Sequence, residues 1–267
     1  MNLRLLRWSD MKKYLLGIFV TAQSLLTALY MGNPAEPEII DTGLFISPDC
    51  SFGIKIGYQG DYVFDRVLKS YNGSRGKIDQ FEILMNQGAV ILNYLDRFEV
   101  YGTVGAMRNH FWYRPHVDDK RREFETGNRW TAGGGVRLLL AQWCNTGLGL
   151  DGKIQYGRPS IQWITVNGVS SSSSGHVIYR EYQGSIAVYH TMGFFTPYLG
   201  AKYSNVHANV DGLSKSVYPR RHFKMTNRCR FGMALGCTLS QGKKVDVNLE
   251  VQLIDEQGVT VGGNIKF

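Results

Sequence analysis

The clearest pattern in this chain is a strict alternation of apolar and polar residues near the C-terminus. Between residues 245 and 253 every second residue is apolar. The residues between them are polar: Asp246, Asn248, Glu250 and Gln252. The alternation resumes over 259–267 and ends on Phe267. Because successive side chains of a strand point to opposite faces, the pattern predicts two strands, each with an apolar face and a polar face.

The same period of two recurs from residue 50 onward and predicts about ten strands, an even number. They are expected at 51–68, 78–94, 97–113, 123–142, 146–158, 176–190, 195–210, 221–240, 244–254 and 258–267. The segment 78–94 carries apolar residues on both faces, so its orientation stays open. Tight links such as Leu95-Asp96 and Cys144-Asn145 alternate with longer ones such as 114–122 and 211–220. The all-β pattern therefore predicts a transmembrane antiparallel β-barrel with short periplasmic turns and longer extracellular loops.

A secreted soluble β-sandwich would also alternate. The length of the strands, the charges in mid-strand and the terminal aromatic residue favour the barrel over the sandwich. We interpret Phe267 as the signal that the outer-membrane assembly machinery reads.

The N-terminal residues have the features of a secretory leader. Two lysines precede an apolar stretch over 14–29, in which Ala28 provides a small residue for cleavage. Three polar residues interrupt this stretch, whereas a spanning helix needs roughly 20 predominantly apolar residues. An uncleaved anchor is the alternative. We therefore predict a signal peptide at 1–28, a periplasmic N-terminal lead at 29–49 and an outer-membrane β-barrel at 50–267.

Charge adds little to this interpretation. The formal net charge of +8 includes +3 from the predicted leader, so about +5 remains. We find no dense stripe of Lys and Arg and expect no nucleic-acid partner. The content of 31 Gly against 7 Pro suits a chain of strands and turns. Outer-membrane lipid is the expected environment.

Several blocks of the chain resemble the chlamydial major outer membrane protein (porin) family. They are GNPAEP at 32–37, GYQGDYVFDRVLK at 57–69, YLDRFEV at 94–100, TVGA at 103–106, FTPYLGAKYS at 195–204, LIDE at 253–256 and the final Phe267. The blocks occur in the family's order, and the stretches between them are reduced. The chain therefore resembles a shortened member of the family.

The resemblance implies a porin that allows passive diffusion of small hydrophilic solutes and ions, and that is also a structural component of the envelope. It further implies a homo-oligomer, usually a trimer, and disulfide cross-links to other envelope proteins. The family's barrel is larger than ten strands. Eight-stranded barrels are filled by side chains and open channels are typical of 16–18 strands, so geometry alone favours a narrow lumen. A non-conducting structural or adhesin barrel is the alternative.

A porin needs a wet lumen lined by charges that set its ion preference. The polar faces of the predicted strands carry candidate residues of both charge signs. A slight excess of basic residues predicts weak anion preference. The lumen-lining candidates are Lys55, Glu99, Arg129, Arg137, Asp151, Lys153, Lys202, Arg230, Asp246 and Glu250. These charges could also pair across the lumen and close it.

The cysteines are interpreted from their compartment. Export places them in an oxidising environment. Cys50, Cys144 and Cys237 fall near the short-turn end and are the disulfide candidates. Cys229 and Cys237 lie eight residues apart on one predicted strand, too far to pair with each other. Unpaired thiols or one internal bridge remain the alternative to the cross-linking that the resemblance implies.

We expect no enzyme. Some ten-strand outer-membrane barrels are proteases with Asp and His at the rim, and His116 and Asp118 lie in a predicted outer loop. One sequence does not show such residues to converge. We find no nucleophile elbow, phosphate loop or metal-ligand spacing, and predict no catalytic residues, no cofactor and no metal site.

Overall fold

The computed structural model describes residues 31–35, 37, 51–71, 76–116, 118, 120–214, 221–241 and 244–267. The signal peptide expected at 1–28, Cys50 and most of the predicted lead lie outside these ranges. Within these ranges the regular structure is made of β-strands. Among the described residues no helix is both long and apolar enough to cross a membrane.

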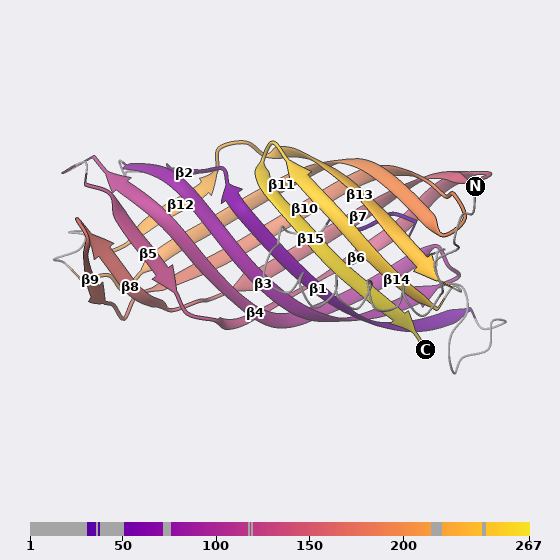
Figure 1. Cartoon of the computed structure of the whole chain (residues 1–267), viewed down its shortest axis with the longest axis horizontal. Helices are drawn as coiled ribbons and strands as arrows, with labels where there is room; N and C mark the ends of the chain where they lie inside the picture. The colour runs from indigo at the N-terminus through magenta and orange to yellow at the C-terminus, as the bar shows by residue number, and fades with distance from the viewer. Residues whose placement is uncertain are drawn as a thin grey trace, which may run out of the picture.

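Ten antiparallel strands form a closed barrel, as predicted (Figure 1). These are β1 (Phe52–Arg66), β3 (Gly76–Tyr94), β4 (Phe98–Pro115), β6 (Arg129–Trp143), β7 (Thr146–Gly157), β10 (His176–His190), β11 (Phe195–Asp211), β13 (Phe231–Gln241), β14 (Val245–Leu253) and β15 (Glu256–Lys266). Their order around the wall is β3-β1-β15-β14-β13-β11-β10-β7-β6-β4, and β4 pairs with β3 to close it. Each strand pairs with a sequence neighbour on both sides, which is an up-and-down topology.

Five short strands extend the wall at one end, on the left of Figure 1. They are β2 (Leu68–Tyr71), β5 (Arg122–Thr126), β8 (Ile161–Val166), β9 (Val169–Ser172) and β12 (Phe223–Asn227). The predicted segments 123–142 and 221–240 are each divided into a short strand and a barrel strand. The β8–β9 hairpin was not predicted. The C-terminus lies at the opposite end, on the right of Figure 1.

Tight turns join the strands at the C-terminal end of the barrel. Leu95 and Asp96 both have positive φ, of 54° and 53°, as a two-residue turn of type I′ requires. The Asn93 side-chain oxygen accepts the Asp96 backbone N–H at 3.1 Å. Cys144 has a φ of 52° in the turn between β6 and β7. This end therefore carries the short turns expected on the periplasmic side.

The outer surface has the pattern of a lipid-facing wall. Large apolar side chains are exposed along the middle of the barrel strands, and aromatic side chains are exposed near both ends. The aromatic residues are Trp130, Tyr182, Tyr203 and Phe231 toward the extended end and Phe52, Tyr94, Phe98 and Trp143 toward the short-turn end. An apolar band between two aromatic girdles is the outer face of a transmembrane barrel.

The interior changes character along the barrel axis. At the extended end it is filled by a hydrophobic cluster in which Phe111 stacks between Phe81 and Phe124, at centroid distances of 5.1 and 4.8 Å. Tyr113 stacks on Phe223 at 4.3 Å. At the short-turn end the inward side chains are mostly polar. This inversion explains why both faces of 78–94 are apolar: Phe81, Ile83 and Met85 face inward, while Val90, Leu92 and Tyr94 face outward.

The wall is also unequal in height. β3 has 19 residues and β4 has 18, whereas β14 has 9 and β15 has 11. At about 3.4 Å per residue, the longest strand is roughly twice the length of the shortest. The rim at the turn between β14 and β15 is therefore low, and the extension carrying β8 and β9 is high (Figure 1).

Candidate functional site

The polar interior at the level of the apolar band is the candidate site. Eight of the ten predicted lumen residues lie buried inside the barrel: Lys55, Glu99, Arg137, Asp151, Lys153, Lys202, Asp246 and Glu250. Arg129 and Arg230 are exposed instead, and the Arg230 guanidinium donates a hydrogen bond to the hydroxyl of Tyr203 on the outer wall. Both arginines adjoin breaks, at Gly127–Asn128 and Arg228–Arg230, where the alternation does not carry through.

A first ion cluster lies toward the short-turn end. Glu99 accepts from the Lys55 Nζ at 2.5 Å and from the Arg137 Nη1 at 2.9 Å. The Arg137 Nε lies 3.5 Å from Asp151, whose carboxylate also accepts the Tyr101 hydroxyl at 2.9 Å. All five side chains are buried. Two cations therefore face two carboxylates from β1, β4, β6 and β7, which offsets the cost of burying the charges.

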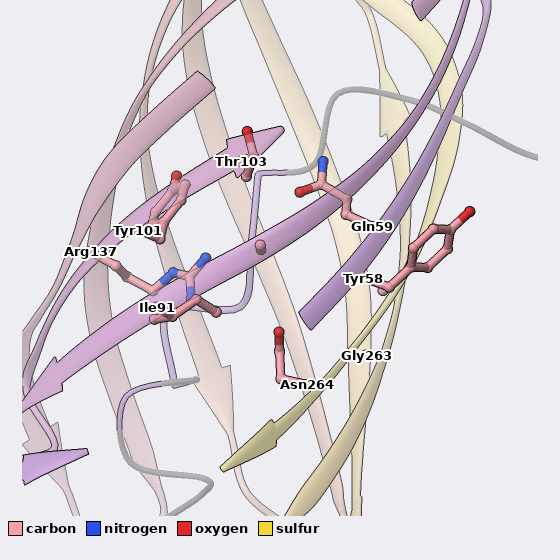
Figure 2. Close-up of a pocket in the computed structure, with 10 residues that line it drawn as sticks. Tyr58, Gln59, Ile91, Tyr101, Thr103, Arg137, Gly263 and Asn264 are labelled. Carbon is pink, nitrogen blue, oxygen red and sulfur yellow. The ribbon is translucent and has the colours of Figure 1, made fainter. Parts of the chain in front are cut away.

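A cavity of about 30 Å³ adjoins this cluster. Tyr101, Thr103 and Arg137 are among the residues that line it, and Figure 2 shows Tyr58 pointing away from them to the outer wall. Such a volume has room for about one water molecule. The described interior is therefore narrow at this level.

A second ion cluster lies further along the axis and centres on Arg66, which is fully buried. Its Nη2 lies 2.7 Å from Glu181, and its Nη1 contacts Asp255 at 3.2 Å and also Glu256. Lys202 pairs with the same two acids, at 3.4 Å from Asp255. Just beyond Arg66, β2 pairs with β12, which in turn pairs with β11, so the Arg66–Glu181 pair links β1 to β10 across the part of the interior that these strands enclose.

The alternation of apolar and polar residues does not predict that Arg66 faces the lumen. Outward residues of β1 occupy even positions from Phe52 to Phe64, so Arg66 would be expected to face lipid. A register shift between Val63 and Asp65 in the pairing with β15 turns Arg66 inward. The register shift is local, and β1 has no glycine at this point from which the sequence could have predicted it.

The acids opposite Arg66 come from a turn with unusual backbone geometry. Ile254 has a φ of 83°, a conformation that β-branched residues rarely adopt. The turn places Asp255 and Glu256, both buried, in the lumen. Strained residues of this kind persist where surrounding contacts hold them, and the ion cluster supplies such contacts.

Residues 31–35 lie inside the barrel. The backbone N–H groups of Met31 and Gly32 donate to the two carboxylate oxygens of Glu250 at 2.7 and 3.1 Å. The Asn33 side-chain amide donates to the Thr238 hydroxyl at 2.6 Å. We refer to residues 31–35 as the lumen segment. The periplasmic lead predicted at 29–49 includes this stretch, whose composition does not point to burial.

Several buried polar atoms of the interior lack a hydrogen-bond partner in the described part of the chain. They include the Lys153 Nζ, the Thr103 hydroxyl and both amide atoms of Gln87 and Gln183. These side chains are at least nine-tenths buried. The interior thus contains, besides the second ion cluster and the lumen segment, a set of inward polar groups suited to contact with water or polar solute.

The disulfide candidates occupy different surroundings. Cys144 is exposed in the tight turn after β6. Cys237 is partly buried and pairs in register with Leu249, on the outward face near the short-turn end. Cys229 lies at the other end, and all three thiols are free in this structure. Phe267, the predicted assembly signal, donates its backbone N–H to Ile54 at 2.8 Å, next to the seam of β1 and β15.

His116, in the loop considered above for a protease site, has no hydrogen bond or ion pair with an acid among the described residues. His116 is exposed, and Asp118 pairs with Arg122 at 2.6 Å. No group of three or more His, Cys, Asp or Glu in the described ranges is arranged to hold a metal ion.

Comparison with known proteins supports the family resemblance. The model of the family described as Chlamydia major outer membrane protein matches residues 10–81. The major outer membrane porin of Chlamydia trachomatis serovar B is 21% identical over 394 aligned positions, covering 96% of this chain and 100% of the relative. The serovar H porin is 22% identical with the same coverage. The resemblance to a family of longer porins is therefore confirmed, with this chain, at 267 residues, the shorter.

Among solved structures, an outer membrane channel from Pseudomonas putida F1 aligns with a TM-score of 0.41 at 12% identity, covering 85% of this chain and 100% of that one. The outer membrane protein OprG from Pseudomonas aeruginosa aligns with a TM-score of 0.39 at 10% identity, covering 80% and 96%. Taken with the porin relatives, the closed barrel and its two aromatic girdles identify this chain as an integral outer-membrane β-barrel of porin-like type.

Proposed function

We propose that this barrel allows passive diffusion of small hydrophilic solutes and ions through its lumen, and that the conformation described above is its closed state. The observation that carries the proposal is the set of inward polar groups that have no hydrogen-bond partner among the described residues, above all the Lys153 ammonium. Removing a charge from water without a partner costs several kcal/mol. If water enters the lumen when it opens, the Lys153 ammonium is hydrated and that cost is removed. In a permanently dry core, Lys153 would only lower the stability of the barrel.

Two features close the lumen. The lumen segment occupies the half nearer the short turns, where Glu250 and Thr238 hold it. The Arg66–Glu181 pair lies in the other half. Breaking a buried ion pair costs about 3–5 kcal/mol, which corresponds to an open fraction of roughly 10⁻² to 10⁻⁴. We therefore expect brief and infrequent openings.

A structural role without conduction is the second candidate. The observation in its favour is the aromatic cluster around Phe111, which fills the interior at the extended end as in the core of a soluble protein. In that case the barrel serves the envelope through its contacts. Assembly into a homo-oligomer and cross-linking through Cys144 belong to this proposal.

The experiment is a conductance measurement in planar bilayers. Gly32 has a φ of 89°, which L side chains rarely adopt, and an added Cβ would also clash with the Arg137 guanidinium, so Gly32→Val disfavours the bound position of the lumen segment. Gly193→Val is the matched control, because Gly193 also has positive φ but has open space around it. We expect Gly32→Val to raise the open probability at least tenfold and Gly193→Val to leave it unchanged.

Ion preference provides a second readout. Wild-type openings should show weak anion preference that strengthens at low salt, where screening falls. Lys153→Glu should move the reversal potential toward cations. If wild type, Gly32→Val and Arg66→Gln all fail to conduct as folded proteins, the diffusion proposal is wrong and the structural role stands.

A further inference from the structure

A groove of about 470 Å³ lies on the outer wall of β6, β7 and β10, near the aromatic girdle of the extended end. Its outward floor is formed by Ala132 and Ile154, and Tyr156 and Tyr182 border it. The neighbouring outward positions have no side chain beyond hydrogen: Gly134, Gly152 and Gly184. An added Cβ at Gly184 would meet nothing within 4 Å, so the wall is open there. The groove is therefore shaped for a slender apolar chain.

Arg180 lines the groove at the end that faces the extracellular side, and a second arginine, Arg158, follows the same strand as Tyr156 just beyond that end. Arg180 lies opposite Tyr156 on β7 and opposite His207 on β11, and its guanidinium sits 5.8 Å from the Tyr156 ring centroid. Arg158 directly follows the end of β7, two residues beyond Tyr156, and its guanidinium hydrogen-bonds His176 at 2.9 Å. Both arginines are exposed, and neither has an acidic partner in the described residues.

The outward side chains that directly neighbour these two arginines are neutral or basic. The acid Asp211 pairs in register with His176, four residues further from the membrane band than the pair of Arg180 and His207. Glu181 and Gln155, which also border the groove through their backbone, turn their side chains into the lumen. The surface that meets an occupant of the groove is therefore positively charged at one end and apolar along its length.

The position of the two arginines along the barrel axis indicates which part of a lipid they contact. Below Arg180, the outward residues of β10 are Tyr182, Gly184, Ile186 and Val188, which belong to the lipid-facing band. Aromatic residues at the edge of such a band mark the headgroup level. Arg158 and Arg180 therefore lie where lipid phosphates lie.

We propose that this groove is a binding site for a phosphorylated membrane lipid, with one acyl chain along Ala132 and Ile154 and the headgroup phosphate bound by Arg158 and Arg180. Guanidinium groups bind phosphate through paired, charge-assisted hydrogen bonds. The ring of Tyr156 holds one of them above the groove before the lipid arrives, which lowers the ordering cost of binding.

The test uses the folded full-length mature protein in detergent, with bound lipid counted by native mass spectrometry. The probes are diphosphorylated lipid A, the same lipid after phosphatase treatment, and inorganic phosphate. The variants are Arg158→Gln with Arg180→Gln, which removes the charges, and Ala132→Phe, which fills the groove. Arg108→Gln is the matched control, because Arg108 is an exposed, outward arginine on β4, away from the groove.

We expect wild type to bind the phosphorylated lipid at least tenfold more tightly than the dephosphorylated lipid. The double arginine variant should abolish that preference, Ala132→Phe should weaken binding of both lipids, and Arg108→Gln should change neither. Equal binding of the two lipids, or an unchanged double variant, overturns the proposal. Inorganic phosphate binding as tightly as the lipid would assign the site to a free anion and overturn it too. A shift in oligomeric mass with Ala132→Phe, without a change in lipid binding, would assign the groove to a second copy instead.

Discussion

Arg66 on β1 and Glu181 on β10 approach to 2.7 Å inside the barrel, at a level where β12 and β11 lie between their strands. Both are fully buried, and Asp255 and Glu256 share the same guanidinium. One side chain therefore joins three segments of the wall. The interior here is a packed structural element, and an open lumen requires its rearrangement.

Replacing Arg66 should destabilise the barrel strongly. Arg66→Gln leaves three buried acids with Lys202 as their remaining cation, which should lower the free energy of unfolding by about 3–5 kcal/mol. Urea unfolding in phospholipid vesicles, followed by tryptophan fluorescence, measures the change. Arg108→Gln, at an exposed position, should stay within about 0.5 kcal/mol of wild type. A similarly small effect for Arg66→Gln would mean that the cluster contributes little to stability.

Lys153 and Arg137 face the lumen from adjacent strands, and their replacement should have opposite effects. Lys153→Met removes a buried ammonium that has no hydrogen-bond partner in the described residues, and should raise the free energy of unfolding by about 1–3 kcal/mol. Arg137→Met strips Glu99 and Asp151 of a shared cation and should lower it by about 3–5 kcal/mol. The same unfolding assay compares them. Destabilisation by Lys153→Met would show that the ammonium is satisfied by water even in the closed state.

The lipid-facing side of β14 should respond to charge according to depth. Leu249 is central on the strand and Val245 begins it, and both are exposed on the outer wall. Leu249→Arg should cost about 2–4 kcal/mol, and Val245→Arg about 0–1 kcal/mol, because the penalty falls toward the interface. Refolding equilibria in vesicles give both values. Equal costs at the two positions would place β14 at another depth in the membrane.

Cross-linking, where it occurs, should depend on Cys144 rather than Cys237. The Cys144 thiol is exposed in the tight turn, whereas Cys237 faces the outer wall beside Leu249. Cys144→Ser should remove most high-mass bands from non-reducing gels of isolated envelopes, and Cys237→Ser should leave them. Bands that persist in Cys144→Ser and disappear with reductant would move the cross-link to another cysteine.

The number of barrel strands and the short-turn end could be predicted from the sequence because alternation is strongest where one face meets lipid and the other is polar. Lys55, Arg137 and Glu250 follow that rule and lie inside. Arg66 does not, because a register shift between Val63 and Asp65 reverses the faces of β1. Arg129 and Arg230 stand beside strand breaks, where the period of two gives no orientation.

Other features need contacts that are distant in sequence. The lumen segment is held by Glu250, more than 200 residues away, and its own sequence contains no strand pattern. The β8–β9 hairpin turns on Asn167 and Gly168, both with positive φ, yet its strands have only six and four residues. Strands that short carry too few alternations to stand out from a loop.

The unequal height of the wall has an immunological consequence. Seen from outside a cell, the β8–β9 hairpin stands at the top of the tall side, with the exposed residues Val169–Ser172, while the turn between β14 and β15 lies low and sends its two acids inward. Of the described residues, those of the hairpin would therefore be reached first by an antibody approaching the intact surface, and the low turn would lie behind the extension. Antigenic variation, where selection by antibodies acts, would be concentrated in the hairpin, and the low turn would change little.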